Sequence, residues 1–330
     1  MEAKDMTEPK ISVIMLTYNR EELVMRAIES ILNQTLRDFE FIIVDNGSSD
    51  RSGTIADEYA EKDLRIHVIH RERGNIGSGR NVGLDAAIGE YITFIDDDDY
   101  AEPDFLEFLY KLAKSHNSDI AVCGSNKEEN GEVLPNLIYV YDKLYIMNAK
   151  QATEAYLHRI HYNCAMPTKL IRREMFDKIR FSNTGSYDDI STTYRYFANA
   201  NVVVAHGIPK YIFYRHAGNN SSPATKHHLL NPAQLREYIT AFRERTRYIS
   251  SILPKLVDLS QYSEWSYMIS MVEKIHRYGL TNCDVPLEFM RGELRKHCNE
   301  FFDGKFIKDF EKEWMEKYIL NNRGVLALAQ

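Results

Sequence analysis

Four consecutive carboxylates end a strongly apolar stretch of this chain. Residues 91–95 have the composition of a buried strand, and Asp96, Asp97, Asp98 and Asp99 follow directly. Two carboxylates about 4 Å apart repel each other by roughly 4 kcal/mol at an effective dielectric constant of about 20. We therefore expect this cluster to hold a cation, and its hard oxygen ligands favour Mg²⁺ or Mn²⁺. The alternative is a solvated acidic loop.

Short β-rich segments alternate with helical patterns from residue 10 to about residue 124, which indicates a parallel sheet with crossover helices. The chain is thus predicted to have an α/β fold, with a mainly helical region over its last hundred or so residues. The predicted strands are 11–16, 39–44, 66–69, 91–95, 120–124, 202–205 and 208–215. The predicted helices are 21–34, 51–62, 103–115, 149–159, 188–199, 265–278, 286–301 and 307–320, with a short one within 71–88 and a long one from Asn231-Pro232.

The composition is that of a globular protein with a sizeable core, because 44% of the 330 residues are hydrophobic. The net charge of -7 excludes a general nucleic-acid binder, since no basic excess is available to neutralise a phosphate backbone. The N-terminus lacks the apolar core of a signal peptide, and no apolar run approaches about 18 residues, so a cytoplasmic location is expected. The four cysteines lie far apart, without zinc or redox spacing, and are expected to be buried and reduced.

Polar side chains follow three of the predicted strands. Thr17, Tyr18 and Asn19 follow the first strand, Asp45 and Asn46 follow the second, and the acidic cluster follows the fourth. Ligands of open α/β sheets bind beyond the carboxyl ends of the strands, where these residues would converge. Each segment alone is typical of a turn, but their joint occurrence predicts a binding site.

Five segments and one proline together resemble the family-two glycosyltransferases with the GT-A nucleotide-binding fold. The ordered set is specific, although no single segment would be, and the resemblance covers about residues 10–215. It implies a mostly parallel twisted sheet flanked by helices, in a transferase of the bacterial surface-glycan type. The segments are 11–19 (ISVIMLTYN), 30–35 (SILNQT), 39–50 (FEFIIVDNGSSD), 80–91 (RNVGLDAAIGEY) and 94–99 (FIDDDD), followed by Pro103.

The resemblance implies a nucleotide-diphosphate sugar as the donor, with its diphosphate neutralised by Mn²⁺ or Mg²⁺ on an Asp-x-Asp motif. Asp96 and Asp98 are the two acids of that motif in this chain. By similarity, Asp96 and Asp97 contact the nucleotide and ribose, Asp98 binds the metal, and Asp96 and His216 are further candidate ligands. His216 or Arg215 would reach the metal or diphosphate when the following loop closes, whereas a lone histidine more often has a purely structural role.

The same resemblance assigns six further residues to the nucleotide. Many relatives have a second aspartate at the position of Asn46. Because asparagine both donates and accepts hydrogen bonds, uracil stays the favoured base and a UDP-sugar the favoured donor. Arg80 has a surface salt bridge as its alternative role. The six residues are Thr17, Tyr18, Asn19, Asp45, Asn46 and Arg80.

Asp188 and Asp189 begin the helix predicted over 188–199, where acidic residues ordinarily stabilise a helix N-terminus. Relatives have Glu-Asp at this place and use the second acid as general base, so the resemblance implies Asp189 as the base, with Asp188 assisting. A base is needed because an acceptor hydroxyl is a poor nucleophile until its proton is removed. One base for one direct displacement implies inversion at the sugar carbon, again by resemblance.

Two other groups of residues have more than one interpretation. Lys169, Arg172 and Arg173 either contact phosphate or begin a solvated basic helix. The glycines between residues 74 and 83 fail the spacing of a dinucleotide-binding motif. They are interpreted as flexible loop positions.

The predicted organisation is an N-terminal tail (1–9), a transferase domain (10–222) and a helical C-terminal region (223–330). Within the transferase domain, residues 10–124 would bind the nucleotide sugar and residues 125–222 the acceptor. The helical region carries a cluster of arginines near its start. This basic tail would either meet a lipid-linked acceptor at the inner face of the membrane, or pack on the catalytic domain or on the second subunit of a homodimer.

The sequence thus predicts a metal-dependent inverting glycosyltransferase that moves a sugar to a glycan or lipid-linked saccharide. One alternative is a non-catalytic nucleotide-sugar-binding or assembly protein of the same fold, against which the joint presence of Asp98 and Asp189 speaks. Another is a sugar nucleotidyltransferase. It would need a glycine-rich basic loop after the first strand, which residues 16–20 do not provide.

Overall fold

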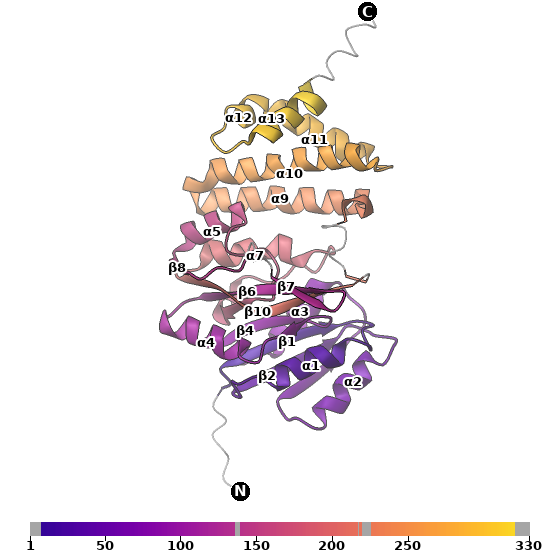
Figure 1. Cartoon of the computed structure of the whole chain (residues 1–330), viewed down its shortest axis with the longest axis vertical. Coiled ribbons are helices and arrows are strands. Elements are labelled where there is room, and N and C mark those ends of the chain that lie inside the picture. The colour runs from indigo at the N-terminus through magenta and orange to yellow at the C-terminus, as the bar shows by residue number, and fades with distance from the viewer. Residues whose placement is uncertain (1–7, 136–138, 217, 220–225, 321–330) are drawn as a thin grey trace, which may run out of the picture. The chain divides into compact units, whose positions relative to one another are not determined.

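A computed structural model of the chain describes residues 8–135, 139–216, 218–219 and 226–320. The chain divides into two compact units, Met1–His216 and Ala217–Gln330, coloured from indigo to yellow along the chain in Figure 1. The first unit is built around one sheet, and the second is helical. The domain boundary expected at 222–223 lies outside the described residues.

Four parallel strands form the part of the sheet that the predicted donor residues follow. They are β1 (Ile11–Thr17), β2 (Phe39–Asp45), β3 (Ile66–His70) and β4 (Tyr91–Asp96). Their order across the sheet is β3-β2-β1-β4. Their carboxyl ends lie side by side, because Thr17 is in register with Asp45 and Leu16 with Asp96.

The rest of the sheet is mixed. It contains β5 (Tyr100–Ala101), β6 (Ile120–Glu129), β7 (Glu132–Pro135), β8 (Leu144–Met147), β9 (Lys169–Arg172) and β10 (Val203–Arg215). β9 runs antiparallel between β4 and β6, and β10 pairs in parallel with β6. The strands predicted over 202–205 and 208–215 are one element, because β10 keeps pairing with β6 through register shifts around Pro209.

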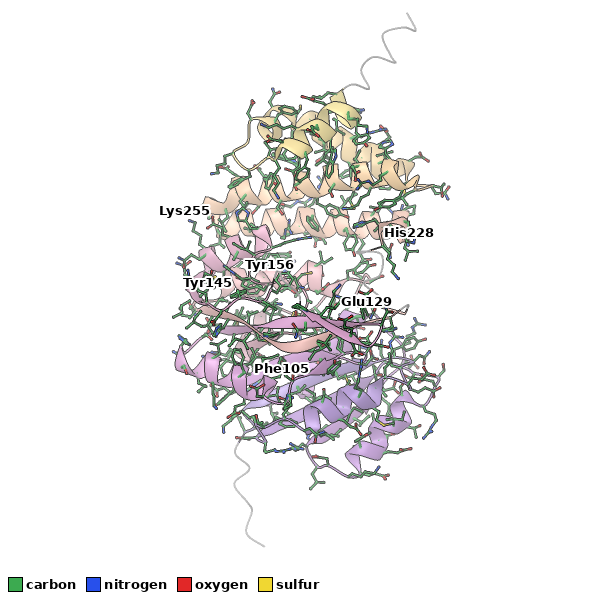
Figure 2. The ribbon with its side chains drawn as sticks, in the orientation of Figure 1. Phe105, Glu129, Tyr145, Tyr156, His228 and Lys255 are labelled. Atoms are coloured by element: carbon green, nitrogen blue, oxygen red, sulfur yellow. The ribbon has the colours of Figure 1, made fainter. Side chains whose placement is uncertain are left out.

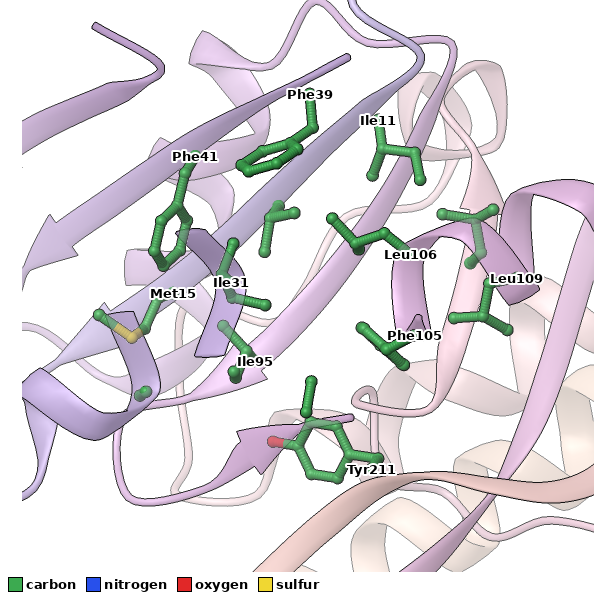
Figure 3. Packing of buried hydrophobic residues seen from close by; sticks show 14 of the residues in the cluster. Ile11, Met15, Ile31, Phe39, Phe41, Ile95, Phe105, Leu106, Leu109 and Tyr211 are labelled. Atoms are coloured by element: carbon green, nitrogen blue, oxygen red, sulfur yellow. The ribbon is translucent and has the colours of Figure 1, made fainter. Parts of the chain in front are cut away.

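Strand β1 separates two apolar layers. Ile11, Val13 and Met15 join a cluster with α1, α2 and α4, whereas Ile14 and Leu16 face α3. Side chains alternate along a strand, so burial on both faces explains the continuous apolar run. Figure 3 shows the first layer, with labelled residues from β1, β2, β4, α1, α4 and β10. The helices are α1 (Val24–Leu32), α2 (Ser52–Ala60), α3 (Ile76–Ala86) and α4 (Phe105–Ser115).

The glycines of α3 allow a close approach of helix and sheet. A Cβ at Gly79 would collide with the side chain of Leu16, and one at Gly83 with Ile14. A Cβ at Gly77 would collide with the carbonyl oxygen of Ser182. The interpretation of these glycines as flexible loop positions is therefore wrong, because they lie in a helix and remove bulk where it meets its neighbours.

The segment after β8 contains α5 (Ala149–His158), α6 (Glu174–Lys178) and α7 (Asp188–Asn199). Helix α7 has the predicted bounds and packs on α5 and α3. Lys169 belongs to β9 and is 1% exposed. The solvated helix start expected here is therefore wrong, because the apolar Leu170 and Ile171 are buried in a strand between β4 and β6.

The second unit is helical throughout its described residues. Helix α10 packs against α9, α11 and α13, and α9 begins with a capping box formed by Asn231 and Gln234. The helix expected over 286–301 is divided into two, and a π-helical turn over Glu316–Leu320 ends the described chain. The helices are α9 (Pro232–Ile252), α10 (Val257–Tyr278), α11 (Asp284–Lys296), α12 (Cys298–Phe302) and α13 (Asp309–Met315).

The arginines of α9 do not share one basic face. Arg245 is buried and donates a hydrogen bond to Ser263 Oγ at 2.8 Å. Arg243 is partly buried, with a guanidinium nitrogen 3.6 Å from a carboxylate oxygen of Glu293. Arg236 and Arg247 are exposed.

Side chains fill the space between the sheet and its helices (Figure 2). Among the helices that the structure describes, none combines the length and apolar character needed to cross a bilayer. All four cysteines are free thiols, with Cys123 and Cys283 buried and Cys164 and Cys298 partly exposed.

Candidate active site

Three strand ends bring predicted donor residues to one edge of the sheet. Thr17 ends β1, Asp45 ends β2 and Asp96 ends β4. The backbone N–H of Asn46 donates to the Thr17 carbonyl at 2.9 Å, which extends the parallel pairing by one residue. Asp97, Asp98 and the turn residues of β1 and β2 therefore leave the sheet from neighbouring positions.

Asp97 is held against the turn that follows β1. Its Oδ2 accepts a hydrogen bond from the Tyr18 backbone N–H at 3.1 Å, and its Oδ1 lies 3.7 Å from Arg20 Nε. Burial and the charge of Asp98 nevertheless raise the pKa of Asp97 to about 7. The carboxylate is thus short of positive charge in the protein alone.

Asp98 and His216 form a pair of potential ligands. His216 follows the end of β10, and its Nε2 lies 2.8 Å from Asp98 Oδ2. The two side chains are 19% and 13% exposed. Residues 118 positions apart in the sequence are thus in direct contact, as the resemblance implied for a shared ligand.

Arg26 supports this pair, although nothing in its helical context singled it out in the sequence. Its guanidinium donates to the Asp98 carbonyl at 3.2 Å and to Glu128 Oε2 at 3.0 Å. It lies between the rings of Tyr100 and Tyr214, 4.5 and 4.3 Å from their centroids. The Tyr214 ring in turn stacks on the imidazole of His216, with centroids 5.3 Å apart.

Asp99 ties the acidic loop to β10. It is buried, and its carboxylate accepts hydrogen bonds from the Tyr211 hydroxyl at 2.9 Å and the Tyr214 N–H at 2.8 Å. Burial, together with the charges of Asp96 and Asp98, raises the pKa of Asp99 well above its usual range. We interpret Asp99 as a structural member of the cluster.

Arg80 joins the two acidic sites. One guanidinium nitrogen donates to Asp96 Oδ1 at 3.1 Å and another to Asp188 Oδ2 at 2.8 Å. Its side chain is 9% exposed, so the surface salt bridge considered from the sequence is wrong. Burial is the main reason why the pKa of Asp96 is raised to about 6 and that of Asp188 is also raised, although Arg80 opposes both shifts.

Asp189 lies in the first turn of α7, beside the buried Asp188. Its Oδ1 accepts the N–H of Ile190 at 2.7 Å, and the side chain is partly exposed. Its charge acts on Arg80 and on Asp96. The structure therefore places Asp189 in the same electrostatic environment as the end of β4, about ninety residues away in the sequence.

His70 is a residue of the site region that the sequence analysis missed. It ends β3 and is in register with Asp45. Its Nδ1 lies 3.0 Å from Asp45 Oδ2, and its Nε2 lies 3.0 Å from Asp57 Oδ1. Hydrogen bonds to these carboxylates raise the pKa of His70. Its place at the end of a strand beside β2 was the available signal.

The side chains of Asn46 and Asn19 shape the turns. Asn46 donates to the Gly74 carbonyl at 2.9 Å and accepts the Gly74 N–H at 3.0 Å. Asn19 has a φ of 49° and accepts the Ser49 N–H at 2.8 Å. Tyr18 has the guanidinium of Arg73 4.1 Å from its ring centroid. Direct contacts of Asn46, Asn19 and Tyr18 with a nucleotide stay predictions.

The donor set fits a hard divalent cation. Asp98 and His216 offer one oxygen and one nitrogen ligand, and the raised pKa values of Asp97 and Asp99 mark a surplus of negative charge. Within the described residues, no three His, Cys, Asp or Glu side chains form a ready-made metal site. Mg²⁺ commonly binds through one or two carboxylates and the phosphates of its substrate, so the pair is compatible with such an ion.

The sequence matches known transferases. Residues 12–180 match the family model described as "Glycosyl transferase family 2". The chain is 31% identical to glycosyltransferase GlyG of Streptococcus pneumoniae over 63% of this chain and 72% of GlyG. It is 38% identical to the poly(ribitol-phosphate) beta-N-acetylglucosaminyltransferase TarP of Staphylococcus aureus over 39% of this chain and 41% of TarP. It covers half or less of several other relatives.

Solved structures share the fold. The crystal structure of residues 1–349 of S. aureus TarS in complex with UDP-GlcNAc has a TM-score of 0.59 and 22% identity, covering 88% of this chain and 89% of that one. The mannosyltransferase PcManGT of Pyrobaculum calidifontis, in complex with GDP-Man and Mn²⁺, has a TM-score of 0.53 and 15% identity, covering 96% and 86%. The expected GT-A fold is confirmed. The chain therefore belongs to glycosyl transferase family 2 and is a glycosyltransferase.

Proposed function

We propose that the chain is a metal-dependent inverting glycosyltransferase that moves a sugar from a UDP-sugar to a hydroxyl group of a glycan or lipid-linked saccharide. The observation that carries this proposal is the position of Arg80. Its guanidinium binds Asp96 at the end of β4 and Asp188 at the start of α7. One buried side chain thus links the acidic cluster to the second acidic pair, so that donor and base would meet at one site.

The proposed donor half is residues 10–124. Thr17, Tyr18 and Asp45 would bind the nucleoside, and Asp96 and Asp97 the ribose and nucleotide. The UDP-GlcNAc bound to the structural neighbour TarS supports a UDP-sugar. The GDP-Man bound to PcManGT indicates that this fold also accommodates another base.

Asp98 and His216, with Asp96 as a further ligand, would hold Mn²⁺ or Mg²⁺, which when bound would neutralise the charge developing on the departing nucleoside diphosphate. Arg26 would keep Asp98 and His216 in place through the Asp98 carbonyl and the Tyr214 ring.

The proposed acceptor half is residues 125–222, with Asp189 as the general base. Asp189 takes the proton of the acceptor hydroxyl while that oxygen attacks the anomeric carbon. The bond from this carbon to the diphosphate oxygen breaks on the opposite side, which inverts the configuration. Asp188 stays bound to Arg80 and orients the first turn of α7.

The acceptor proposal rests on relatives. TarP is named for transfer to poly(ribitol-phosphate), and we propose an acceptor from bacterial surface-glycan synthesis for this chain. A cytoplasmic enzyme at the inner face of the membrane, and a homodimer, stay predictions. Arg236 and Arg247 are the exposed arginines of α9 that would carry the membrane contact.

The test is a panel of nucleotide sugars with Mn²⁺, read out as release of nucleoside diphosphate. We expect a UDP-sugar to be consumed, with activity lost on chelation and restored by Mn²⁺. Thermal melts with each free nucleotide and Mn²⁺ give an independent measure of binding. A protein that neither consumes a donor nor is stabilised by any nucleotide with metal would overturn the proposal.

A further inference from the structure

Lys169 is a buried lysine that the proposed reaction leaves without a role. It begins β9, and its side chain is 1% exposed. Its Nζ donates to the Ala165 carbonyl at 2.5 Å, and within the described residues no carboxylate forms an ion pair with it. Burial lowers the pKa of Lys169 to about 8. Removing an ammonium group from water is unfavourable without a compensating charge, so its location needs an explanation.

The backbone that presents Lys169 is strained. Thr168, the preceding residue, has a φ of 77° and is buried. A positive φ is a genuine outlier for a β-branched residue, and such strain persists where the surrounding structure enforces it. The Thr168 carbonyl accepts the Cys123 N–H at 3.0 Å, which holds this conformation against β6. The lysine is therefore directed to one side of β9 at a conformational cost.

The groups near the ammonium are two thiols and one carboxylate. The charges of Cys164, Cys123 and Asp189 all act to raise the pKa of Lys169 against the effect of burial. Burial, and then the charge of Asp189, raise the pKa of the Cys164 thiol to about 12. Cys164 therefore stays neutral near pH 7, which leaves Asp189 as the anion that Lys169 faces.

The loop before β9 connects Lys169 to helix α7. Lys169 Nζ binds the Ala165 carbonyl, and the preceding carbonyl, that of Cys164, accepts a hydrogen bond from Thr193 Oγ1 at 2.7 Å. Thr193 lies in α7, one turn after Asp189. The Cys164 thiol also forms a side-chain hydrogen bond with Asp189. The ammonium thus acts on the first turn of α7 through its charge and through this loop.

We infer that Lys169 is a positioning residue for the general base: its buried ammonium favours the ionised form of Asp189 and fixes the loop that contacts this carboxylate. The inference rests on the proposed role of Asp189 and adds the group that sets its proton affinity. Lys169 contacts neither donor nor acceptor in this assignment.

The charges around Asp189 make Lys169 decisive. They come from α3, the end of β4, α7, the loop before β9 and β9 itself, and they belong to Arg80, Asp96, Asp188, Cys164 and Lys169. Arg80 is already bound to two carboxylates. Without Lys169, three carboxylates would share one cation, and protonation of Asp189 would become easier.

The test compares pH–rate profiles of Lys169→Met and Lys169→Gln with the wild type. An opposite charge near a carboxylate stabilises its ionised form, so removing it should move the acidic limb of kcat to higher pH by about one unit. At a pH on that limb, kcat should fall about tenfold, while KM for the donor and the affinity for UDP with Mn²⁺ stay unchanged. Lys169→Arg, which keeps the charge, should restore the wild-type limb if it folds.

Lys178→Met is the matched control, because Lys178 is exposed on α6, and its profile should match the wild type. An acidic limb unchanged in Lys169→Gln or Lys169→Met overturns the inference. Loss of activity with an unshifted limb assigns Lys169 a merely structural role and overturns it as well. Asp189→Asn separates the two levels: if that variant keeps its turnover, the proposed base is wrong, whatever Lys169 does.

Discussion

On the donor side of the site, carboxylates at strand ends receive hydrogen bonds from backbone amides, whereas the acceptor side places its acids in the first turn of a helix. Asp97 is held by the Tyr18 N–H and Asp45 by the Ser48 N–H. Asp188 depends instead on the buried Arg80, far away in the sequence. The donor side is therefore built from sheet register and local turns, and the acceptor side from buried charges.

This difference predicts that substitutions on the acceptor side separate turnover from stability. Asp189 is partly exposed and Asp188 is buried in an ion pair, although the two are adjacent. Substitutions on the donor side should instead change the affinity for nucleotide and metal. Four predictions test this division, beginning with the largest expected effect.

Asp189→Asn should lower kcat by about 1,000-fold, because general base catalysis contributes about 10²- to 10⁴-fold. Binding of UDP with Mn²⁺ should stay within about twofold of wild type, since Asp189 lies outside the donor half. Calorimetric titration and steady-state kinetics measure the two quantities. Equal losses of turnover and nucleotide affinity would contradict the division.

Asp188→Ala should lower the free energy of unfolding by about 3 kcal/mol, because it leaves the guanidinium of Arg80 buried with one partner fewer. Asp85→Ala is the control. It breaks the more exposed pair with Arg180 and should cost no more than about 1 kcal/mol. Urea denaturation measures both values. A Asp188→Ala variant as stable as the control would show that Arg80 does not depend on this carboxylate.

Arg26→Gln should weaken activity about tenfold, mostly by raising the Mn²⁺ concentration needed for half-maximal rate. The variant loses the stacking between Tyr100 and Tyr214 and the hydrogen bond to the Asp98 carbonyl. Arg37→Gln, at an exposed position, is the control. An unchanged Mn²⁺ dependence, measured by kinetics and by metal titration of the UDP complex, would refute a role for Arg26 in holding Asp98.

His70 should give the smallest effect, with a defined pH dependence. Its pKa is raised, so the folded state binds the proton more tightly than the unfolded state. The stabilisation is complete below the unfolded pKa of about 6.5 and is lost as the pH rises through the folded pKa. Because the imidazole is half exposed, the Tm advantage over His70→Gln should be only about 1–2 °C at acidic pH. An advantage that grows at alkaline pH would contradict this assignment.

The fold of the donor half was predictable because its signals are local. The strands and helices from residue 11 to residue 115 were placed within a few residues of their observed bounds. Parallel register then brought Thr17, Asp45 and Asp96 together as the strand pattern implied. His70 carried the same signal at the end of β3, and its omission shows that one strand end was left out of the comparison.

The misinterpreted segments depend on contacts that the sequence does not display. The glycines of α3 have helical neighbours, but the need for small residues comes from Leu16 and Ile14 beneath them. The segment 169–172 is short and basic at both ends, and its insertion between β4 and β6 decides that it is a strand.

By itself the sequence determined the family, the parallel half of the sheet and the identity of the two acidic sites, because apolar periodicity and ordered local motifs are written in consecutive residues. Tertiary structure alone decided which charges meet: Arg80 with Asp96 and Asp188, His216 with Asp98, and Lys169 beside Asp189. These pairs join residues up to 118 positions apart. Electrostatic interactions depend on distance and burial, and both are properties of the folded chain.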